Sequence, residues 1–221
     1  MTDLPNVEQS YAVELVRKGI HLCSLSIPII YYFIEKATAL SILIPLTLVF
    51  GLTDLARVYH RPTRELYHRL FGWLLRKHEL DEDARRLNGA TYVLLSACLF
   101  IWLFPKVVFI TAFAFLIVSD TLAALVGRLY GRRRFLRKSL EGAAAFFFSA
   151  LVVVAVAPKL TGTAAEYAIA AASAVVGTIV EAWGSSIDDN LLIPLTVGAT
   201  LWLLYLLVLP TVDVYALDAL R

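Results

Sequence analysis

The chain has 221 residues, of which 59% are hydrophobic, and its mean hydropathy is +0.73. This composition lies well outside the balance of a soluble globular domain and excludes that class. The formal net charge of +2 carries little information by itself, because the position of each charge matters more than the sum in a membrane protein.

Seven apolar segments are long enough to cross a bilayer as helices. A hydrocarbon core about 30 Å thick requires roughly 20 mostly apolar residues per helix. The predicted spans are 19–34, 37–55, 89–104, 106–127, 142–158, 163–183 and 191–210. We therefore predict an all-α, polytopic membrane helix bundle with residues 1–221 as a single transmembrane domain. The acidic and polar start of the chain does not match a cleavable signal peptide, so we expect the first helix to be retained.

Two polar segments separate the spans on one side of the predicted membrane. The segment 57–87 has apolar residues at Leu66, Leu70, Trp73 and Leu74, a spacing that predicts an amphipathic helix along the membrane surface. The segment 128–141 is a short basic loop. The segment 57–87 could cover a site or serve only as a connector.

The basic residues fix the predicted orientation. Sixteen of the twenty Lys and Arg fall before the first span, after the second or after the fourth. The other four, Lys36, Lys106, Lys159 and Arg221, fall in the alternate loops and at the C-terminus. The positive-inside rule then predicts a cytoplasmic N-terminus and an outer C-terminus.

Polar residues that a lipid-facing helix avoids gather at the predicted cytoplasmic ends. They are Glu14, His21, Asp54, Asn88, Asp120, Ser139, Glu141, Glu181, Asp188, Asp189 and Asn190. Ionisable groups at membrane depth are costly unless they are paired, hydrated or buried in the bundle, so the group predicts a functional site there.

Each of these residues also has a purely structural interpretation when it is taken singly. Asp54 and Arg57 could form an ordinary cap or ion pair at a helix end, and the Gly127-x-x-x-Gly131 spacing could permit close helix packing. His21 could be a satisfied core histidine, and the basic run a topology signal or a contact with anionic lipids. Cys23 and Cys98 lack metal-like spacing and most simply pack as small hydrophobic residues.

Carboxylates beside Lys and Arg suit a phosphorylated ligand held through Mg²⁺. The hard cation takes carboxylate oxygens, while the basic groups hold the remaining phosphate oxygens. Phosphoryl transfer needs mainly positioning and charge neutralisation. The P-loop and protein-kinase motifs are absent from the sequence, so a nucleotide would bind in another way.

Five sequence elements in chain order resemble the CTP-dependent lipid kinase family, which includes dolichol kinase, phytol kinase and the CTP-using diacylglycerol kinase. The elements are Glu14-x-x-Arg17-Lys18-x-x-His21 with Pro28, Leu87-Asn88-Gly89-Ala90-Thr91-Tyr92, Ser119-Asp120-x-x-Ala123-Ala124-x-x-Gly127-Arg128-x-x-Gly131, Lys138-Ser139-x-Glu141-Gly142, and Glu181 with Asp188-Asp189-Asn190-x-x-x-Pro194. The resemblance covers nearly the whole chain, and the third and fourth elements are its most specific part. It implies that CTP donates its terminal phosphate to the hydroxyl of a lipid alcohol such as a polyprenol, phytol or diacylglycerol.

The resemblance also implies residue roles. Catalytic residues would be Asp120, Asp188, Asp189, Lys138 and Glu141. Ligands to Mg²⁺ would come from Asp120, Glu181, Asp188 and Asp189, with Asp188 or Asp189 alternatively the base that receives the hydroxyl proton. Residues near CTP or the acceptor would be Arg17, Lys18, His21, Asn88, Gly127, Arg128, Gly131, Arg132, Arg133, Lys138, Ser139, Gly142 and Asn190.

Two other functional classes stay open on sequence alone. Phosphatidate cytidylyltransferases carry a related Ser-Pro-Lys-x-Thr-x-Glu-Gly element and a different acidic motif, from which Lys138-Ser139-Leu140-Glu141-Gly142 departs. A transporter or a lipid-binding membrane protein could also hold buried carboxylates, although a transporter would place them nearer the bilayer midplane. The expected partners are CTP, a lipid alcohol and membrane lipids, with no nucleic acid, and a homodimer is compatible with the sequence.

Overall fold

The structure of the protein is a computed structural model that describes residues 11–74, 87–185 and 187–219. Within these ranges the regular secondary structure is helical apart from one small β-hairpin, which confirms the predicted all-α class. The first half contains α1 (Tyr11–Cys23), α2 (Ser26–Phe33), α3 (Lys36–Tyr59), α4 (Arg61–Phe71), η1 (Gly72–Leu74) and α6 (Gly89–Leu103). The second half contains α7 (Lys106–Ala114), η2 (Phe115–Ser119), α8 (Asp120–Tyr130), β1 (Arg134–Phe135), β2 (Lys138–Ser139), α9 (Leu140–Val156), α10 (Ala164–Trp183), α11 (Asp189–Val208) and η3 (Ala216–Ala219).

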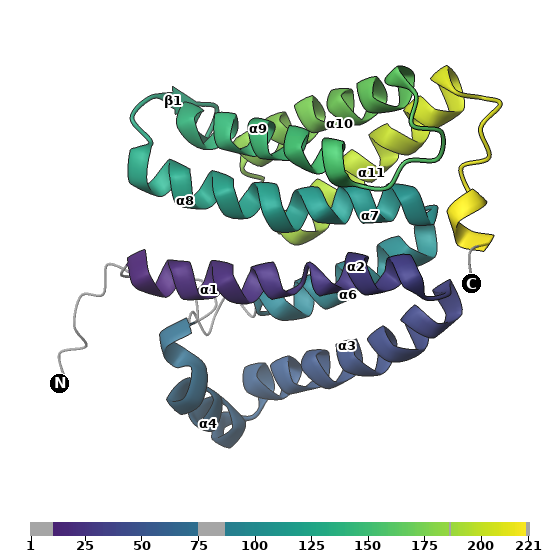
Figure 1. Ribbon diagram of the computed structural model, residues 1–221. Helices are drawn as coiled ribbons and strands as arrows, with labels where there is room; N and C mark the ends of the chain where they lie inside the picture. The colour runs from purple at the N-terminus through teal and green to yellow at the C-terminus, as the bar shows by residue number, and fades with distance from the viewer. Residues whose placement is uncertain (1–10, 75–86, 186, 220–221) are drawn as a thin grey trace.

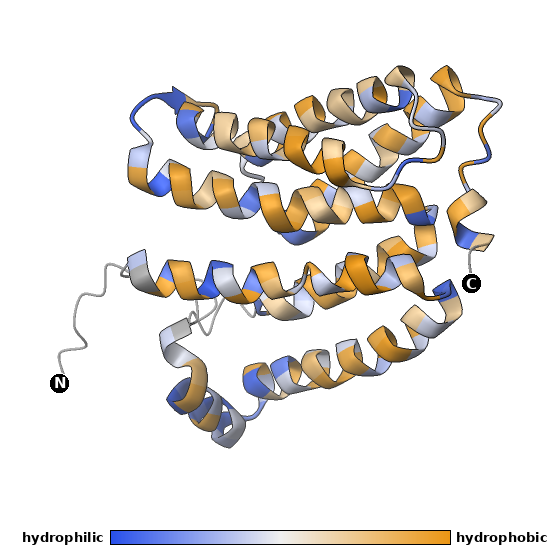
Figure 2. Cartoon of the chain, in the orientation of Figure 1, coloured by the Kyte–Doolittle hydropathy of each residue, from blue (hydrophilic) through white to orange (hydrophobic). Residues whose placement is uncertain are grey.

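Helices occupy each of the predicted apolar ranges, and four helical segments are long and apolar enough to cross a membrane. These are α3, the continuous rod Lys106–Tyr130 formed by α7, η2 and α8, and the helices α10 and α11. The helices α6 and α9 are apolar but shorter, with 15 and 17 residues. Figure 2 shows hydrophobic residues along the helices, with hydrophilic residues concentrated in the hairpin and in α4. These features are those of a multi-pass membrane protein.

The rod from α7 to α8 runs through the middle of the bundle (Figure 1). The helices α9, α10 and α11 lie on one side of it, and α1, α2 and α6 lie on the other, with α3 outermost. Of the most apolar stretch of the rod 83% is buried inside the protein, compared with 17% for α3. The rod is therefore the core of the bundle, whereas α3 packs mainly on α6 and α4 and exposes most of its surface.

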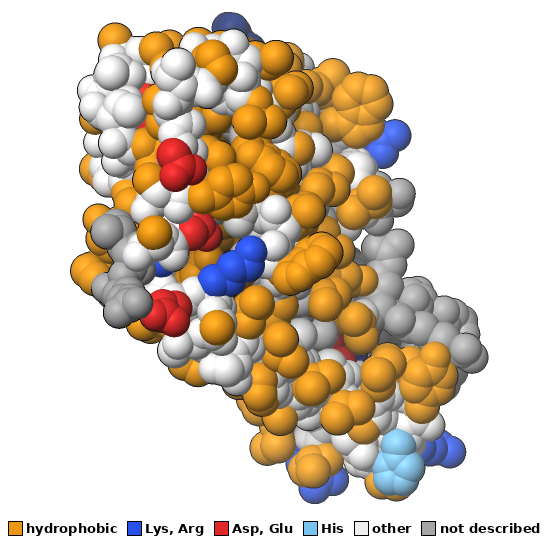
Figure 3. Space-filling model, turned by 90° about the vertical axis from the view of Figure 1, so that its right-hand side faces the viewer, with side chains coloured by type: hydrophobic (Ala, Val, Ile, Leu, Met, Phe, Trp, Pro, Cys, Tyr) orange, Lys and Arg blue, Asp and Glu red, His pale blue; other side chains and the backbone are white. Residues whose placement is uncertain are grey.

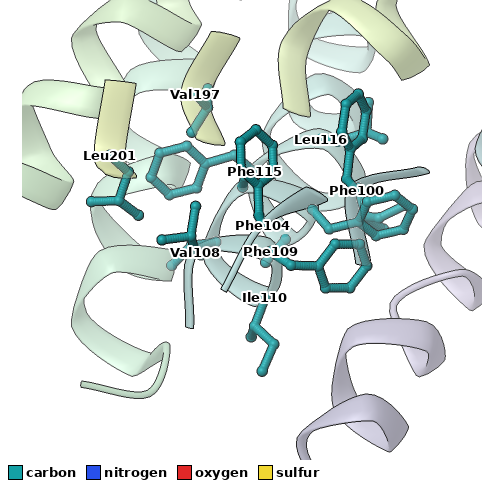
Figure 4. Packing of buried hydrophobic residues seen from close by; sticks show 14 of the residues in the cluster. Phe100, Phe104, Val108, Phe109, Ile110, Phe115, Leu116, Val197 and Leu201 are labelled. Carbon is teal, nitrogen blue, oxygen red and sulfur yellow. The ribbon is translucent and has the colours of Figure 1, made fainter. Parts of the chain in front are cut away.

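Aromatic side chains fill the centre of the bundle (Figure 4). Phe100 stacks on Phe104 with ring centroids 5.6 Å apart, and Phe109 stacks on Phe113 at 4.9 Å. Gly198 lets α11 approach this layer, because a Cβ there would lie 2.5 Å from the Phe104 ring. Close packing of this kind is what associates helices in lipid, where the surroundings are as apolar as the side chains.

The predicted first span is divided into two helices near Ser24 and Leu25. Pro28 lacks the amide hydrogen that would continue the helical hydrogen-bond pattern to Ser24. The amides of Ser24 and Leu25 instead donate to carbonyls three residues earlier, at 3.0 and 2.9 Å. The break separates the polar face of α1 from the apolar helix α2.

We refer to the end where α1, α6, α9 and α11 begin and α8 ends as the charged end (left in Figure 1). At the opposite end, which faces the viewer in Figure 3, the surface is mostly hydrophobic with scattered charges. Three lysines there donate to carbonyls at the ends of helices: Lys36 to Trp102 (2.8 Å), Lys106 to Ile34 (3.1 Å), and Lys159 to Val154 and Ala157 (2.7 and 2.8 Å). Each lysine thus satisfies carbonyls that a helix end leaves without partners and complements the helix dipole.

Candidate functional site

A cavity of about 710 Å³ opens at the charged end, between α1, α3, α4, α6, α8, the hairpin and the start of α11. Its size lies within the range of ligand-binding pockets. Nine predicted site residues line it: Arg17, Lys18, His21, Asn88, Asp120, Lys138, Asp188, Asp189 and Asn190. Segments more than 100 residues apart in the sequence therefore meet in one place, as the gathering of polar residues predicted.

The deepest contact in the cavity is an ion pair between α1 and α8. The Nζ atom of Lys18 lies 2.6 Å from Oδ2 of Asp120 and 3.5 Å from the Asp120 carbonyl oxygen. The two residues are 6% and 8% exposed, so the charges are almost fully removed from solvent. Removing one member of such a pair leaves a buried charge without its partner, at a cost of roughly 3–5 kcal/mol.

A π-helical turn precedes Asp120. The amide of Asp120 donates to the carbonyl of Phe115, five residues earlier, and closes this turn within the rod. The additional residue of a π-turn changes the direction in which the residues after it point, and such turns are frequent at functional sites. Asp120 lies ten residues before Tyr130 at the end of α8, about 15 Å along the helix axis at 1.5 Å per residue.

A second group of charges forms around Lys138 on the hairpin. Its Nζ atom lies 2.8 Å from Oε1 of Glu181 and 3.1 Å from Oδ2 of Asp189. Burial lowers the pKa of Lys138, but the carboxylates of Asp189, Glu181 and Asp120 outweigh burial and raise the pKa above its ordinary value. The lysine is therefore positively charged at neutral pH and links the hairpin to α10 and α11.

Three predicted site residues cap the helices that begin at the charged end. Side-chain oxygens accept hydrogen bonds from backbone amides: Asn88 from Thr91 at 2.9 Å in α6, Ser139 from Gly142 at 3.1 Å in α9, and Asp188 from Asn190 at 2.9 Å in α11. Such caps satisfy amides that would otherwise lack partners. Much of the sequence pattern at these positions thus has a structural explanation.

Asn88 and Asp54 hold α3, α4 and α6 together. The amide of Asn88 donates to Oδ2 of Asp54 at 2.6 Å, and its side-chain Nδ2 donates to the Tyr67 hydroxyl at 3.0 Å. Oδ1 of Asp54 accepts from Nε of Arg57 at 3.0 Å, and Asp54 is fully buried. The structural interpretation of Asp54 and Arg57 is confirmed, and neither residue lines the cavity.

The glycine positions of the predicted motifs allow α8 and α9 to approach closely. A Cβ on Gly131 or Gly142 would lie 2.9–3.0 Å from atoms of Ser139, and a Cβ on Gly127 would lie 3.0 Å from its hydroxyl oxygen. This contact fits the packing interpretation of the Gly127 and Gly131 spacing.

The hairpin places the remaining predicted residues outside the cavity. Glu141 accepts hydrogen bonds from the backbone amides of Arg132 and Arg133, at 3.0 and 3.3 Å, and so holds the hairpin on the start of α9. The side chains of Arg132 and Arg133 are exposed and do not line the cavity. Arg128 is also exposed, with Nη1 3.8 Å from Oε2 of Glu14. The structure therefore does not bring these three arginines into the cavity with Lys18 and Lys138.

The carboxylates of the cavity bear on whether the site could hold a metal ion. Within the described ranges no three His, Cys, Asp or Glu side chains are placed to hold an ion by themselves. Mg²⁺ that arrives with a triphosphate needs only one or two carboxylates, because phosphate oxygens and water complete its octahedron. Asp188 fits this requirement best, since among the described residues it alone of the acidic residues lining the cavity makes no ion pair.

Sequence reasoning missed the apolar half of the cavity. Its wall is formed by Ile20, Val49, Phe50, Phe71 and Val93, from α1, α3, α4 and α6. We call these five residues the apolar wall. No sequence signal distinguishes them, because an apolar residue of a membrane helix looks the same whether it faces lipid, a neighbour or a cavity.

Comparison with known proteins finds a relative in Rickettsia. The uncharacterized protein RP860 of Rickettsia prowazekii (strain Madrid E) is 30% identical to the chain over 190 residues, which cover 85% of this chain and 93% of the Rickettsia protein. No protein-family model and no solved structure matches the chain.

Proposed function

The chain belongs to the same protein family as RP860 of Rickettsia prowazekii, and we propose that it is a membrane-embedded kinase that transfers the terminal phosphate of CTP to the hydroxyl of a lipid alcohol. The choice of CTP rests on the resemblance of the Ser119-Asp120 and Lys138-Ser139 elements to the CTP-dependent lipid kinases. The choice of a lipid acceptor rests on that resemblance and on the apolar wall.

One observation supports this proposal most strongly. Two lysine–carboxylate pairs, Lys18 with Asp120 and Lys138 with Asp189, line a cavity whose other half is apolar. Lysines supply the cations that phosphates require, carboxylates supply a base and a metal ligand, and an apolar wall accommodates a hydrocarbon chain. The N-termini of α6 and α11 also line the cavity, and their positive dipole ends favour an anion there.

The residues would act by exchanging partners. When the triphosphate binds, its oxygens replace the Asp120 carboxylate on Lys18, and Lys138 neutralises charge on the transferred group. Asp120 is then available to accept the proton of the lipid hydroxyl while the oxygen–phosphorus bond to the lipid forms and the bond to CDP breaks. Asp188 would hold the Mg²⁺ that arrives with CTP, and this ion would neutralise further phosphate charge.

This proposal includes seven crossings of the membrane, with the N-terminus and the charged end in the cytoplasm. Support comes from the basic residues at the charged end, since the cytoplasm is where CTP is available. At the opposite end, Lys36, Lys106 and Lys159 are used as helix caps. On this view Asp120 lies deep because the lipid hydroxyl reaches it from within the bilayer, while the hairpin faces the water that delivers CTP.

The test is a turnover assay on the purified protein in detergent. Labelled CTP or ATP is supplied with Mg²⁺ and a panel of polyprenol, phytol, diacylglycerol and phosphatidic acid. Formation of a lipid monophosphate with CDP is the expected result. A CDP-lipid with pyrophosphate would instead identify a cytidylyltransferase, and no turnover on any acceptor would leave a transporter or a lipid-binding protein.

A further inference from the structure

The apolar wall of the cavity includes side chains of α1 and α3 that are also exposed on the outer surface of the bundle. Val49 and Phe50 lie on α3, a helix long and apolar enough to cross the membrane. Val49 is thirteen residues from Lys36 and ten from Tyr59, about 20 Å and 15 Å along the helix axis, so it sits well inside the span. Val49 and Phe50 are 60% and 40% exposed, and Ile20 of α1 is 52% exposed. The apolar wall is therefore continuous with the outer surface of the bundle.

The cavity lies between helices that pack on different neighbours. The helix α1 packs on α8 and η2, whereas α3 packs on α6 and α4, and both α1 and α3 contribute side chains to the same cavity. Figure 1 shows α3 as the outermost helix of the bundle. An apolar surface between two membrane helices at this depth faces hydrocarbon, so a lipid chain can reach it from the bilayer.

We propose that the apolar wall holds the hydrocarbon chain of the lipid alcohol next to its hydroxyl, and that this lipid enters from the bilayer between α1 and α3. The proposal rests on the proposed function for the identity of the head group. The occupant must be an amphiphile, because the same cavity is lined by the apolar wall and by the paired charges of Lys18 and Asp120, which favour a hydroxyl or a phosphate. Val49 and Phe50 then determine which chains fit, since they are the part of the apolar wall that α3 contributes.

The experiment uses the full-length protein in lipid nanodiscs with a photoreactive isoprenoid alcohol that carries a diazirine close to its hydroxyl. Labelled peptides are identified by mass spectrometry, with and without an excess of unmodified isoprenoid alcohol. We expect labelling of the apolar wall that the excess alcohol reduces at least several-fold. Phe148, Val152 and Val156 on α9, which are 62–77% exposed, provide a lipid-facing reference surface in the same molecule.

Two variants of α3 make the test specific. Val49→Trp adds bulk to the apolar wall, and Leu48→Trp adds the same bulk to a neighbour that is 59% exposed and does not line the cavity. Both side chains are mostly exposed, so neither change disturbs buried packing. We expect Val49→Trp to reduce competed labelling several-fold and to raise the KM for a long isoprenoid alcohol more than for a short one, with Leu48→Trp unchanged.

The outcomes separate this inference from the kinase proposal, because labelling requires no nucleotide. Equal labelling of the wall and of α9, labelling that excess alcohol does not reduce, or equal effects of the two tryptophan variants would overturn the lateral site even if turnover is observed. Competed labelling of the wall in a protein that turns over no nucleotide would preserve the lateral site and remove the kinase.

Discussion

Replacement of Lys18 and Asp120, singly and together, tests the ion pair at the centre of the proposed site. Lys18→Met and Asp120→Asn each leave one almost fully buried charge without its partner, which costs roughly 3–5 kcal/mol in protein interiors. Because the pair borders a cavity that water can enter, we expect the lower end, about 3 kcal/mol. For a chain of this length that corresponds to a decrease in melting temperature of about 6–12 °C.

The double variant distinguishes a true pair from two unrelated sites. Once both charges are gone, no buried charge remains, so the double variant should lose no more stability than either single variant. Thermal unfolding in detergent measures this coupling, and phosphate transfer from CTP should be lost in all three proteins. Arg61→Met serves as the control, because Arg61 and Glu65 form an ion pair whose side chains are 86% and 69% exposed. This substitution should change the free energy of unfolding by less than about 0.5 kcal/mol. Additive destabilisation in the double variant, or near-normal transfer by Asp120→Asn, would refute the reasoning.

Three further predictions follow from single contacts. Lys138→Met should lower kcat by about 100- to 1,000-fold, whereas the exposed Arg134→Met in the same hairpin should leave kcat unchanged. Because the neighbouring carboxylates raise the pKa of Lys138, the lysine stays charged and the rate should not fall between about pH 7 and 9. An equal effect of both variants would count against the role of Lys138. Asn88→Ala should lower the free energy of unfolding by about 1–2 kcal/mol, because α6 loses its cap, while the KM for CTP should change less than about twofold. A large change in KM at unaltered stability would instead make Asn88 a nucleotide ligand. Gly198→Ala should lower the free energy of unfolding by about 1–3 kcal/mol, because the added Cβ meets the Phe104 ring. Adding Phe104→Leu should restore part of this loss. An unchanged melting temperature for Gly198→Ala would contradict the packing.

The helices could be predicted from the sequence because hydropathy is a local property. Runs of apolar residues fix where a membrane helix lies, and helices occupy all the predicted ranges. Packing is not local, and the sequence therefore did not reveal that Lys18 would meet Asp120 across 102 positions rather than remain near lipid. The break before Pro28 was visible in principle from proline chemistry, but the hairpin of two-residue strands was not.

The arginines of the hairpin show the limit of reasoning from charge. A basic run beside carboxylates predicts phosphate contacts for Arg132 and Arg133, but charge does not indicate the direction of a side chain. Glu141 binds the backbone amides of this run, and the side chains point outward.

Of the segment 57–87, the part 75–86, with Arg76, Lys77, Arg85 and Arg86, lies outside the described residues. The part that is described includes α4, whose exposed Leu66 and Leu70 suit a membrane surface.

The capping residues explain why fold and function are difficult to separate in this sequence. Helices that begin around a cavity need oxygen-bearing side chains at their first positions, and an anion site at the same place needs the free amides and positive dipole ends of those helices. In Asn88 and Ser139 the single side-chain oxygen is occupied by the helix cap, whereas Asp188 caps α11 through Oδ1 alone. Among the described residues, its Oδ2 makes no hydrogen bond or ion pair that would compete with a ligand. If Mg²⁺ enters with the nucleotide, Asp188→Asn should therefore weaken Mg²⁺-dependent binding of CTP while preserving the cap, because an asparagine side chain caps a helix about as well as aspartate.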